Sequence, residues 1–400
     1  MKITLTGCGM GTPGSLTGEA REALREADLI IGAPRLLQSL PEGSCKNRLA
    51  STKPDDILQK IDHSGAVRVC VAYSGDTGFY SGAQSLSRLL EGRPDVEWRV
   101  IPGVSSLAYF AARAGFGWQG VRTVSAHGRQ CSAPAYLREG DPVFFLTGGA
   151  LGPAELCRQL CGAGMQDARV TVGEELSYPG ESIIRGTAGE LAVREFKPLS
   201  VMLAQWDGGE PPVPGIPDGE WIRGTVPMTK QEVRAAALAK LRVRRGDTLY
   251  DVGAGTGAVS VELAIAAGHG EVYAVEQEED ACALIRQNSK KFHVANLHLI
   301  CGRAPEALKE LPAPDAVFVG GSGGALRNIL EAVLQKKHSV RVCISAIAVE
   351  TLSEALTGMR ELGFTGLDVA QISVSRAREA GPYHMMMAQN PVFLISGVGP

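Results

Sequence analysis

Short apolar runs alternate with longer, helix-like segments through the second half of the chain. The run at 248–252 is apolar and partly β-branched, which is typical of a buried strand. Further strands are predicted at 271–276, 297–301, 315–319 and 340–346, with helices between them at 259–267, 280–292, 325–335 and 349–362. Two last strands, near 366–376 and 384–396, are predicted to close the sheet. This order predicts a doubly wound α/β sheet with an antiparallel end.

The first half of the chain alternates in the same way, and a proline-rich segment separates the two halves. Strands are predicted near 2–5, 68–72, 97–101, 142–146 and 169–172. Residues 207–219 contain four prolines and four glycines, which exclude a helix or a central strand. The sequence therefore predicts a domain at 1–206, a stiff linker at 207–222 and a second domain at 223–400.

A glycine-rich turn follows the strand at 248–252, and it indicates a cofactor. It comprises Gly253, Ala254, Gly255, Thr256 and Gly257, and a predicted helix begins directly after it. Such a turn lets the backbone approach a ligand closely, beside the unpaired N–H groups of the helix. Glu276, at the end of the next strand, can accept hydrogen bonds from both hydroxyls of a ribose.

Two nucleotide-containing cofactors fit this arrangement. Gly253, Gly255 and Ala258 match a relaxed dinucleotide fingerprint, in which a helix N-terminus holds a pyrophosphate. Asp251 would repel a pyrophosphate, but it suits the ammonium and sulfonium of S-adenosylmethionine. The sequence therefore favours S-adenosylmethionine, with a nicotinamide dinucleotide and a turn without ligand as the alternatives.

Three glycine-bearing loops follow strands of the first half, where open α/β sheets bind their ligands. Turns are commonly built of such residues, so each loop alone is a weak signal. The loops carry Gly7 and Gly9; Gly75 and Asp76; and, after Pro102-Gly103, Val104, Ser105 and Ser106.

In their order and in their residues, these loops resemble those of the tetrapyrrole methylase family. Its members are class III methyltransferases that bind S-adenosylmethionine between two α/β subdomains. Residues 125–129, Ser-Ala-His-Gly-Arg, resemble the branch that methylates a meso carbon of a corrin precursor. Thr77 is one departure, since the family often has proline there. The resemblance implies a tetrapyrrole methylase fold for the first domain and one S-adenosylmethionine site in its three loops.

The second half resembles the class I decarboxylating methyltransferases of the same pathway. The matching segments are 226–234, 251–257, 302–306 and 315–324. The resemblance implies a Rossmann-like class I fold and a second S-adenosylmethionine site, formed by Thr229, residues 253–257, Glu276 and Ala304. Together, the two resemblances imply methylation of C5 and C15 of a precorrin-6 type tetrapyrrole and decarboxylation of its C12 acetate, within cobalamin biosynthesis.

This chemistry demands alignment of the reacting groups more than it demands acid–base groups, so neither a Ser-His-Asp set nor a metal is expected. A polycarboxylate substrate does require basic side chains near the site. Lys230 and Arg234 lie one helical turn apart, and Arg376 and Arg378 share one strand face. The substrate-side candidates are these four residues together with His384, His127 and Arg129.

Composition narrows the class of partner. A net charge of −3 and 6% aromatic residues oppose a nucleic-acid binder. They also disfavour the first alternative function, an RNA or protein methyltransferase fused to a class III domain. The second alternative, a non-catalytic S-adenosylmethionine-binding scaffold, would not need the substrate-side basic residues.

The remaining expectations concern location and assembly. Nine scattered cysteines indicate a reduced, cytoplasmic protein, and the N-terminus is too polar for a signal peptide. No apolar run is long enough to cross a membrane, and a homo-oligomer is expected from the second-domain type. The residues do not distinguish a cobalt-free substrate from a cobalt-containing one.

Overall fold

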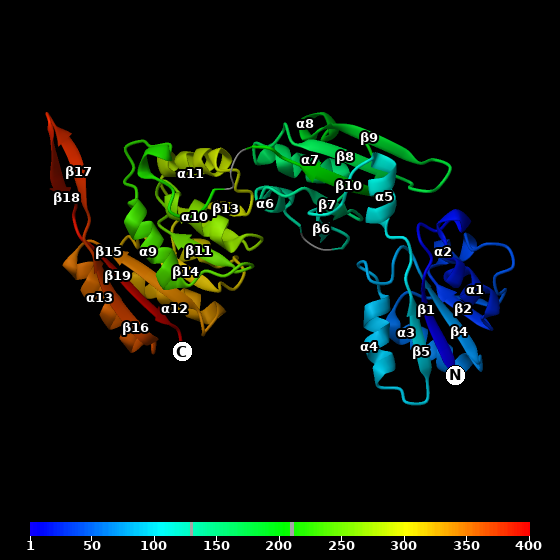
Figure 1. Cartoon of the computed structure of the whole chain (residues 1–400). Helices are drawn as coiled ribbons and strands as arrows, with labels where there is room; N and C mark the ends of the chain where they lie inside the picture. Colours follow the sequence, from blue (N-terminus) through cyan, green and yellow to red (C-terminus); the bar gives the residue numbers. More distant parts are fainter. Residues whose placement is uncertain (129–130, 209–211) are drawn as a thin grey trace. The chain divides into compact units, whose positions relative to one another are not determined.

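The computed structural model describes residues 1–128, 131–208 and 212–400 (Figure 1). The chain divides into two compact units. The N-terminal unit comprises residues 1–130, 142–155 and 169–205, and the C-terminal unit comprises 131–141, 156–168 and 206–400. The C-terminal unit thus includes α6 (Ala133–Leu137) and most of α7 (Pro153–Gly162).

The first sheet of the N-terminal unit consists of five parallel strands. Its order is β3 (Arg48–Ala50), β2 (Leu29–Gly32), β4 (Arg68–Tyr73), β1 (Lys2–Gly7) and β5 (Glu97–Ile101). The connections contain η1 (Pro13–Ser15), α1 (Gly18–Glu26), α2 (Pro34–Gln38), α3 (Pro54–Ser64) and α4 (Ala83–Glu91). Alternate residues of one strand enter opposite core clusters, as Val69 and Cys70 do, so both faces of the sheet are covered.

The second sheet of the N-terminal unit is mixed. Its order is β6 (Arg122–Ser125), β7 (Val143–Leu146), β10 (Ser200–Gln205), β8 (Arg169–Glu174) and β9 (Ser182–Thr187), with only β6 and β7 parallel. It is accompanied by α5 (Ser106–Ala114) and α8 (Ala188–Leu191). Phe110 of α5 is fully buried, with its ring 6.1 Å from that of Phe144.

The C-terminal unit contains a seven-stranded sheet. Its order is β13 (Leu297–Cys301), β12 (Val272–Glu276), β11 (Leu249–Val252), β14 (Ala316–Val319), β15 (Arg341–Ala346), β19 (Val392–Val398) and β16 (Thr365–Ile372). The first five strands are parallel, and β19 is antiparallel to both of its neighbours. The helical segments are η2 (Asp218–Glu220), α9 (Gln231–Leu241), α10 (Ala258–Ala267), α11 (Glu279–Lys291), η3 (Glu306–Leu308), α12 (Leu326–Lys336) and α13 (Val349–Glu361).

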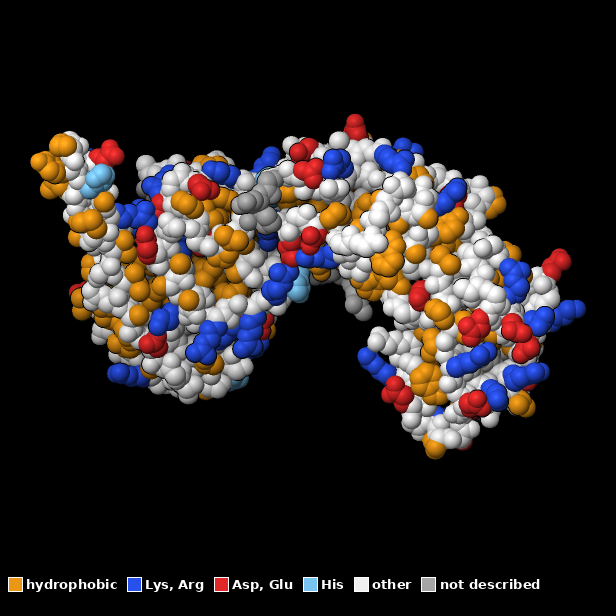
Figure 2. Space-filling view, viewed as in Figure 1, with side chains coloured by type: hydrophobic (Ala, Val, Ile, Leu, Met, Phe, Trp, Pro, Cys, Tyr) orange, Lys and Arg blue, Asp and Glu red, His pale blue; other side chains and the backbone are white. Residues whose placement is uncertain are grey.

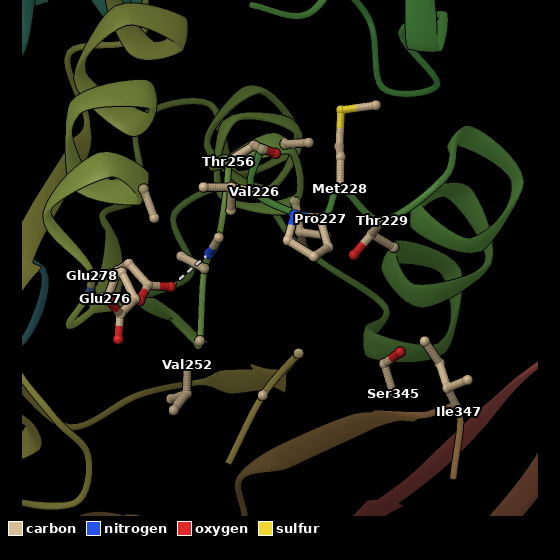
Figure 3. Close-up of a pocket in the computed structure, with 18 of the residues that line it drawn as sticks. Val226, Pro227, Met228, Thr229, Val252, Thr256, Glu276, Glu278, Ser345 and Ile347 are labelled. Carbon is tan, nitrogen blue, oxygen red and sulfur yellow. Dashed lines mark hydrogen bonds between the residues drawn. The ribbon is translucent and has the colours of Figure 1, made fainter. Parts of the chain in front are cut away.

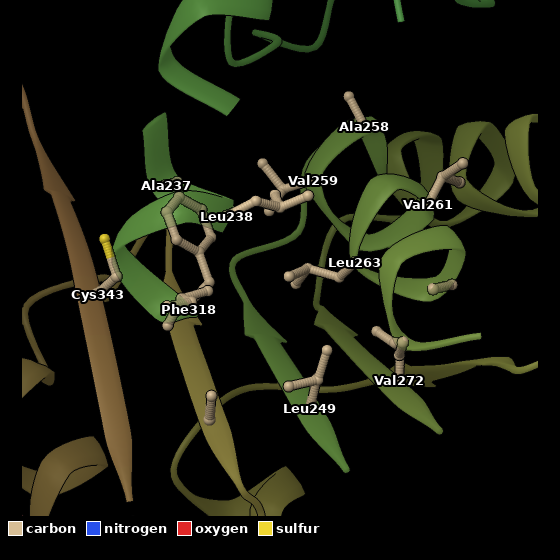
Figure 4. Close-up of a cluster of buried hydrophobic side chains, with 14 of the residues drawn as sticks. Ala237, Leu238, Leu249, Ala258, Val259, Val261, Leu263, Val272, Phe318 and Cys343 are labelled. Atoms are coloured by element: carbon tan, nitrogen blue, oxygen red, sulfur yellow. The ribbon is translucent and has the colours of Figure 1, made fainter. Parts of the chain in front are cut away.

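Apolar side chains of α9 and α10 pack onto one face of this sheet (Figure 4). Val259 and Leu263 of α10 lie in one buried cluster with Leu249 of β11 and Phe318 of β14. The predicted fold class, a tetrapyrrole methylase fold followed by a doubly wound Rossmann-like sheet, is confirmed. The prediction missed β2, β3, β6, β9 and β10, which are short or lie between the segments that were recognised.

The end of the chain differs from the prediction. The structure has four strands where two long strands were predicted. The additional strands, β17 (Ser375–Ala380) and β18 (Tyr383–Ala388), form a separate antiparallel hairpin. Residues 389–391 break the second predicted strand, and Pro391 there has no N–H to donate to a sheet. The segment Asn390–Phe393, expected inside the last strand, therefore begins in a loop.

The second half of the predicted linker is attached to the C-terminal unit. Ile216 and Trp221 are buried in its main core cluster. The Gly215 N–H donates to Glu262 of α10 at 2.9 Å, and Asp218 is buried. Within the described ranges, no helix combines the length and the hydropathy needed to cross a membrane.

Candidate active site

A cavity of about 850 Å³ lies at the carboxyl ends of β11, β12 and β14, in the C-terminal unit. Its lining includes Val252, Glu276 and Gly320, which end or follow these strands. Figure 3 shows Glu276 and Glu278 on one side of the cavity and Ser345 on the other. Small-molecule pockets span about 300–1,000 Å³, so this cavity has room for a cofactor and part of a second molecule.

The glycine turn forms the floor of this cavity in a conformation that depends on glycine. Gly253 has φ 71°, and a Cβ there would lie 2.5 Å from the backbone oxygen of Gly321. The turn between β11 and α10 therefore packs directly against the loop that follows β14. All five residues of the predicted turn, 253–257, lie between β11 and α10. Of these, Gly253, Ala254, Gly255 and Thr256 line the cavity.

Glu276 connects the end of β12 to the glycine turn. One carboxylate oxygen accepts a hydrogen bond from the Gly255 N–H at 2.8 Å. The other accepts from the N–H groups of Gln277 and Glu278, at 2.8 and 3.0 Å. The side chain is nearly buried but reaches the cavity, so its position is set before any ligand arrives.

Asp251 is fully buried beneath the turn. The Ser260 hydroxyl donates to one carboxylate oxygen, and the other oxygen has no partner. Burial, together with the nearby charge of Glu276, raises the pKa of Asp251 from 3.8 to about 7. A buried acceptor without a partner is uncommon, and Asp251 itself is absent from the described lining of the cavity.

Replacing Asp251 with Asn should make the ligand-free protein less sensitive to pH. Because the folded pKa is raised, the folded state retains a proton that the unfolded state releases between pH 4 and 7. The free energy of unfolding therefore falls as the pH rises through this range. At pH 8 the variant should be more stable by about 2–4 kcal/mol, with little difference at pH 4. Urea unfolding at both pH values measures this, and equal pH dependence in both proteins would contradict it.

Several other predicted residues lie at the same cavity. Thr229, Lys230, Glu276 and Ala304 all line it, although they come from three separate segments. Lys230 is half-buried and directly precedes α9. Sequence reasoning did not assign Ser345, Ile347, Ile372, Val374, Gln389 and Asn390, which also line the cavity. Pro391 was the available signal for the last two, because a proline makes an unbroken strand there improbable.

Arg234 does not face the cavity, contrary to the prediction. Its side chain is completely buried, and its guanidinium donates to Glu262 at 2.8 Å and to Asp218 at 2.9 Å. It also donates to the backbone oxygens of Thr229, at 2.6 Å, and of Ile216. Arg234 therefore joins α9 to three other parts of the chain: α10, the residues directly before α9, and the end of the predicted linker.

The three candidates on the terminal hairpin are absent from the described lining of the cavity. Arg376 pairs with Glu232 at 2.7 Å and lies 3.6 Å from Asp218. Arg378 is exposed on the same strand, and His384 is exposed on the opposite strand, 4.0 Å from Glu379. Nothing in this arrangement brings these side chains to Lys230.

In the N-terminal unit, the three predicted loops meet at the ends of β1, β4 and β5. Gly9 and Gly75 exchange backbone hydrogen bonds of 3.1 and 2.6 Å. A Cβ on Gly103 would lie 2.3 Å from the Gly75 oxygen and 2.8 Å from the Gly7 carbonyl carbon. The loops therefore pack backbone against backbone, which only glycine permits at this distance.

The polar residues of these loops stabilise the turns. Asp76 accepts a hydrogen bond from the Gly78 N–H at 3.0 Å. Ser105 caps α5 by accepting from the Ala108 N–H at 3.1 Å, Val104 precedes it and Ser106 is buried at the first position of the helix.

Of the last two substrate-side candidates, His127 and Arg129, the structure describes only the first. His127 is exposed, next to Gly148, whereas Arg129 lies outside the described residues. In the part of the chain that the structure describes, no group of three or more His, Cys, Asp or Glu side chains could hold a metal ion.

Comparison with known proteins agrees with this geometry. Residues 220–398 match a family described as the precorrin methyltransferase domain, and residues 2–192 match the tetrapyrrole (corrin/porphyrin) methylases. The probable cobalt-precorrin-6B C(15)-methyltransferase (decarboxylating) of Pyrobaculum calidifontis is 46% identical over 186 residues, which are 46% of this chain and 95% of that protein. The chain belongs to the decarboxylating precorrin methyltransferase family.

Similarity to this family extends over the whole chain. The precorrin-6Y C(5,15)-methyltransferase [decarboxylating] of a Sinorhizobium species is 29% identical over 403 residues, covering 98% of this chain and 95% of that protein. The crystal structure of precorrin-6y C5,15-methyltransferase from Geobacter metallireducens shares 37% sequence identity with this chain, covers 47% of this chain and 98% of its own, and has a TM-score of 0.45. These matches confirm the resemblance of both halves of the sequence to methyltransferases of one pathway. The chain is a methyltransferase. Membership of this family supports S-adenosylmethionine as the methyl donor.

Proposed function

We propose that the chain is a bifunctional enzyme of cobalamin biosynthesis that methylates C5 and C15 of a precorrin-6 type tetrapyrrole and decarboxylates its C12 acetate. The end-to-end match to the Sinorhizobium relative carries this proposal, because that protein is named for both methylations and for decarboxylation. The two recognised domains and the cavity at Glu276 support it.

The enzyme has two cofactor sites in this proposal, one in each predicted domain. In the C-terminal unit, Gly253, Ala254, Gly255 and Thr256 line the cavity, and Glu276 offers acceptors for a ribose. These features fit S-adenosylmethionine, which supplies an electrophilic methyl group when bound. In the N-terminal unit, the meeting loops of Gly7, Gly75 and Gly103 are the proposed second site.

The outer part of the C-terminal cavity is suited to the substrate. Ile347, Ile372, Val374 and Val392 give it an apolar wall, and Lys230 supplies a cation. Lys230 can pair with one carboxylate of the substrate while the apolar wall removes water from the carboxylate that is lost. Desolvation disfavours a carboxylate more than the carbon dioxide it becomes, so this wall promotes decarboxylation. The two methylations require the nucleophilic carbon to be aligned with the methyl group.

Mass spectrometry of the product tests the proposal. Purified enzyme is incubated with a precorrin-6 type substrate and S-adenosylmethionine, with cobalt-free and cobalt-containing substrates in parallel. We expect a gain of two methyl groups and a loss of one carbon dioxide with one of the two substrates. An unchanged mass with both authentic substrates would refute the proposal.

The alternative functions receive no comparable support. An RNA or protein methyltransferase fused to a class III domain would not be expected to align end to end with a precorrin enzyme. A non-catalytic scaffold does not need the cation and the apolar wall that accompany the cofactor turn. We place the activity in the cytoplasm, where nine free thiols would remain reduced.

The hairpin of β17 and β18 is the proposed self-association surface. The side chains of Tyr383, Met385, Met386 and Met387 are 49–73% exposed. Figure 2 shows apolar side chains gathered over this hairpin. An isolated two-stranded hairpin is marginally stable in water, so pairing with the hairpin of a second copy would stabilise it.

Light scattering after size-exclusion chromatography tests this surface. The wild-type chain should be an oligomer, and a Met385→Ser/Met387→Ser variant should shift toward the monomer. Val193→Ser, at an exposed apolar position in the N-terminal unit, is the matched control and should leave the mass unchanged. A monomeric wild-type chain would contradict the proposed role of the hairpin.

A further inference from the structure

Two cysteines lie beside the strand end that carries Glu276. Cys301 ends β13, where it is paired in register with Glu276 of β12. Cys282 lies in the first turn of α11, and its thiol is 3.5 Å from the backbone oxygen of Glu276, the residue paired with Cys301. Cys301 is exposed, whereas Cys282 is almost completely buried. Reagents in solution can therefore reach the Cys301 thiol, whereas the Cys282 thiol is shielded from them.

A positive charge adjoins the exposed thiol. A guanidinium nitrogen of Arg286, one helical turn beyond Cys282 on α11, lies 3.4 Å from the Cys301 sulfur. A thiolate formed at Cys301 would therefore have an adjacent partner for its charge, which is typical of reactive cysteines. Burial, reinforced by Cys301 itself, raises the pKa of Cys282 to about 11, so little of the Cys282 thiol is ionised at neutral pH.

We propose that Cys301 is a site of thiol–disulfide modification, and that Cys282 is its resolving thiol. The co-reactant is a low-molecular-weight disulfide, RSSR. The Cys301 thiolate attacks one sulfur of RSSR, which forms a mixed disulfide and releases RS⁻. The Cys282 thiolate then attacks the Cys301 sulfur, which forms the protein disulfide and releases a second RS⁻. The two protein thiols lose two electrons to RSSR, and their protons end on the two released thiols.

The modification would disturb the cofactor site. The backbone oxygen of Glu276 accepts hydrogen bonds from the Gly302 N–H, at 2.8 Å, and from the Cys282 thiol, at 3.5 Å. A disulfide removes the thiol hydrogen and ties α11 to the end of β13, directly before Gly302 and Ala304, which line the cavity. We expect weaker binding of S-adenosylmethionine in the C-terminal unit. This consequence rests on the proposed function, whereas the modification does not.

Intact-mass analysis and peptide mapping of the full chain test the chemistry. The reduced protein is treated with oxidised glutathione at pH 8. We expect a glutathione adduct at Cys301 that converts to a Cys282–Cys301 disulfide, faster at pH 9 because more of Cys282 is ionised. Cys282→Ser should stop at the adduct, and Cys301→Ser should form neither product. Cys45→Ser, which removes a half-buried cysteine of the other unit, should behave as the wild type.

Two results would overturn the proposal. The first is a Cys301 that stays unmodified while other cysteines react, and the second is an adduct at Cys301 that never converts to the disulfide in the wild type. Binding is measured separately by calorimetry, where losing a hydrogen bond predicts about tenfold weaker affinity in the oxidised protein, reversed by dithiothreitol. A complete disulfide with unchanged affinity would refute the effect on the site. Failure of the proposed enzymatic function would leave the mass result intact.

Discussion

Glu276→Ala is expected to weaken binding of S-adenosylmethionine to the C-terminal unit by about 100-fold. The carboxylate is the proposed acceptor for both ribose hydroxyls, and hydrogen bonds to a charged group contribute about 1.5–3 kcal/mol each. Alanine also removes the acceptor that holds the Gly255 N–H at 2.8 Å, so the glycine turn loses its link to β12. Isothermal titration with S-adenosylmethionine measures the loss.

Two variants separate this effect from a general loss of structure. Glu276→Gln keeps an acceptor for the Gly255 N–H but lacks the charge, so its affinity should be intermediate. Glu279→Ala removes an exposed acid of the same segment that is not among the residues lining the cavity, and it should bind normally. The proposed site in the N-terminal unit should keep its affinity throughout. Equal weakening of both sites would show that Glu276 does not belong to the C-terminal cofactor site alone.

Arg234→Met is expected to destabilise the C-terminal unit by about 3–5 kcal/mol, the usual cost of removing one partner from a buried ion pair. Glu262 is fully buried and Asp218 nearly so, and both would lose their guanidinium. The backbone oxygens of Thr229 and Ile216 would also lose a donor. Urea unfolding followed by tryptophan fluorescence measures the change, because Trp221 lies 5.0 Å from this guanidinium.

Companion variants identify the cause of the destabilisation. Arg234→Met/Glu262→Met removes both charges of one pair, so it should recover part of the loss. Arg234→Lys keeps the charge, but it cannot reach all four acceptors and should be intermediate. Arg245→Met breaks a pair in which Arg245 is exposed and Glu139 is half-buried, and it should cost less than about 1 kcal/mol. If Arg234→Met were as mild as Arg245→Met, the buried network would not have the structural role assigned here.

Much of the proposed cofactor site could be predicted because its signals are local. The turn at Gly253 needs positive φ and close backbone approach, so glycine marks it directly in the sequence. Glu276 was predictable because a strand, a turn, a helix and a second strand place the end of β12 next to the turn. The loops of Gly7, Gly75 and Gly103 follow the same logic, since parallel strands end at one edge of a sheet.

Residues with distant partners were predicted less well. Spacing showed that Lys230 and Arg234 share a helix face, but it did not show which part of that face is buried. Arg234 is buried because Asp218 and Glu262 approach it from other segments. Asn390 was expected inside a strand, yet it lines the cavity because the chain leaves the sheet as a hairpin and returns.

By itself, the sequence determined the class of both domains, the positions of the glycine-rich loops at the strand ends and the family. These depend on short-range backbone requirements that particular residues satisfy. Only the tertiary structure decided which basic side chains reach the cavity, that Arg234 is structural, and that Cys282 and Cys301 both lie beside Glu276. Burial and pairing depend on contacts between segments far apart in the chain, and no local pattern encodes them.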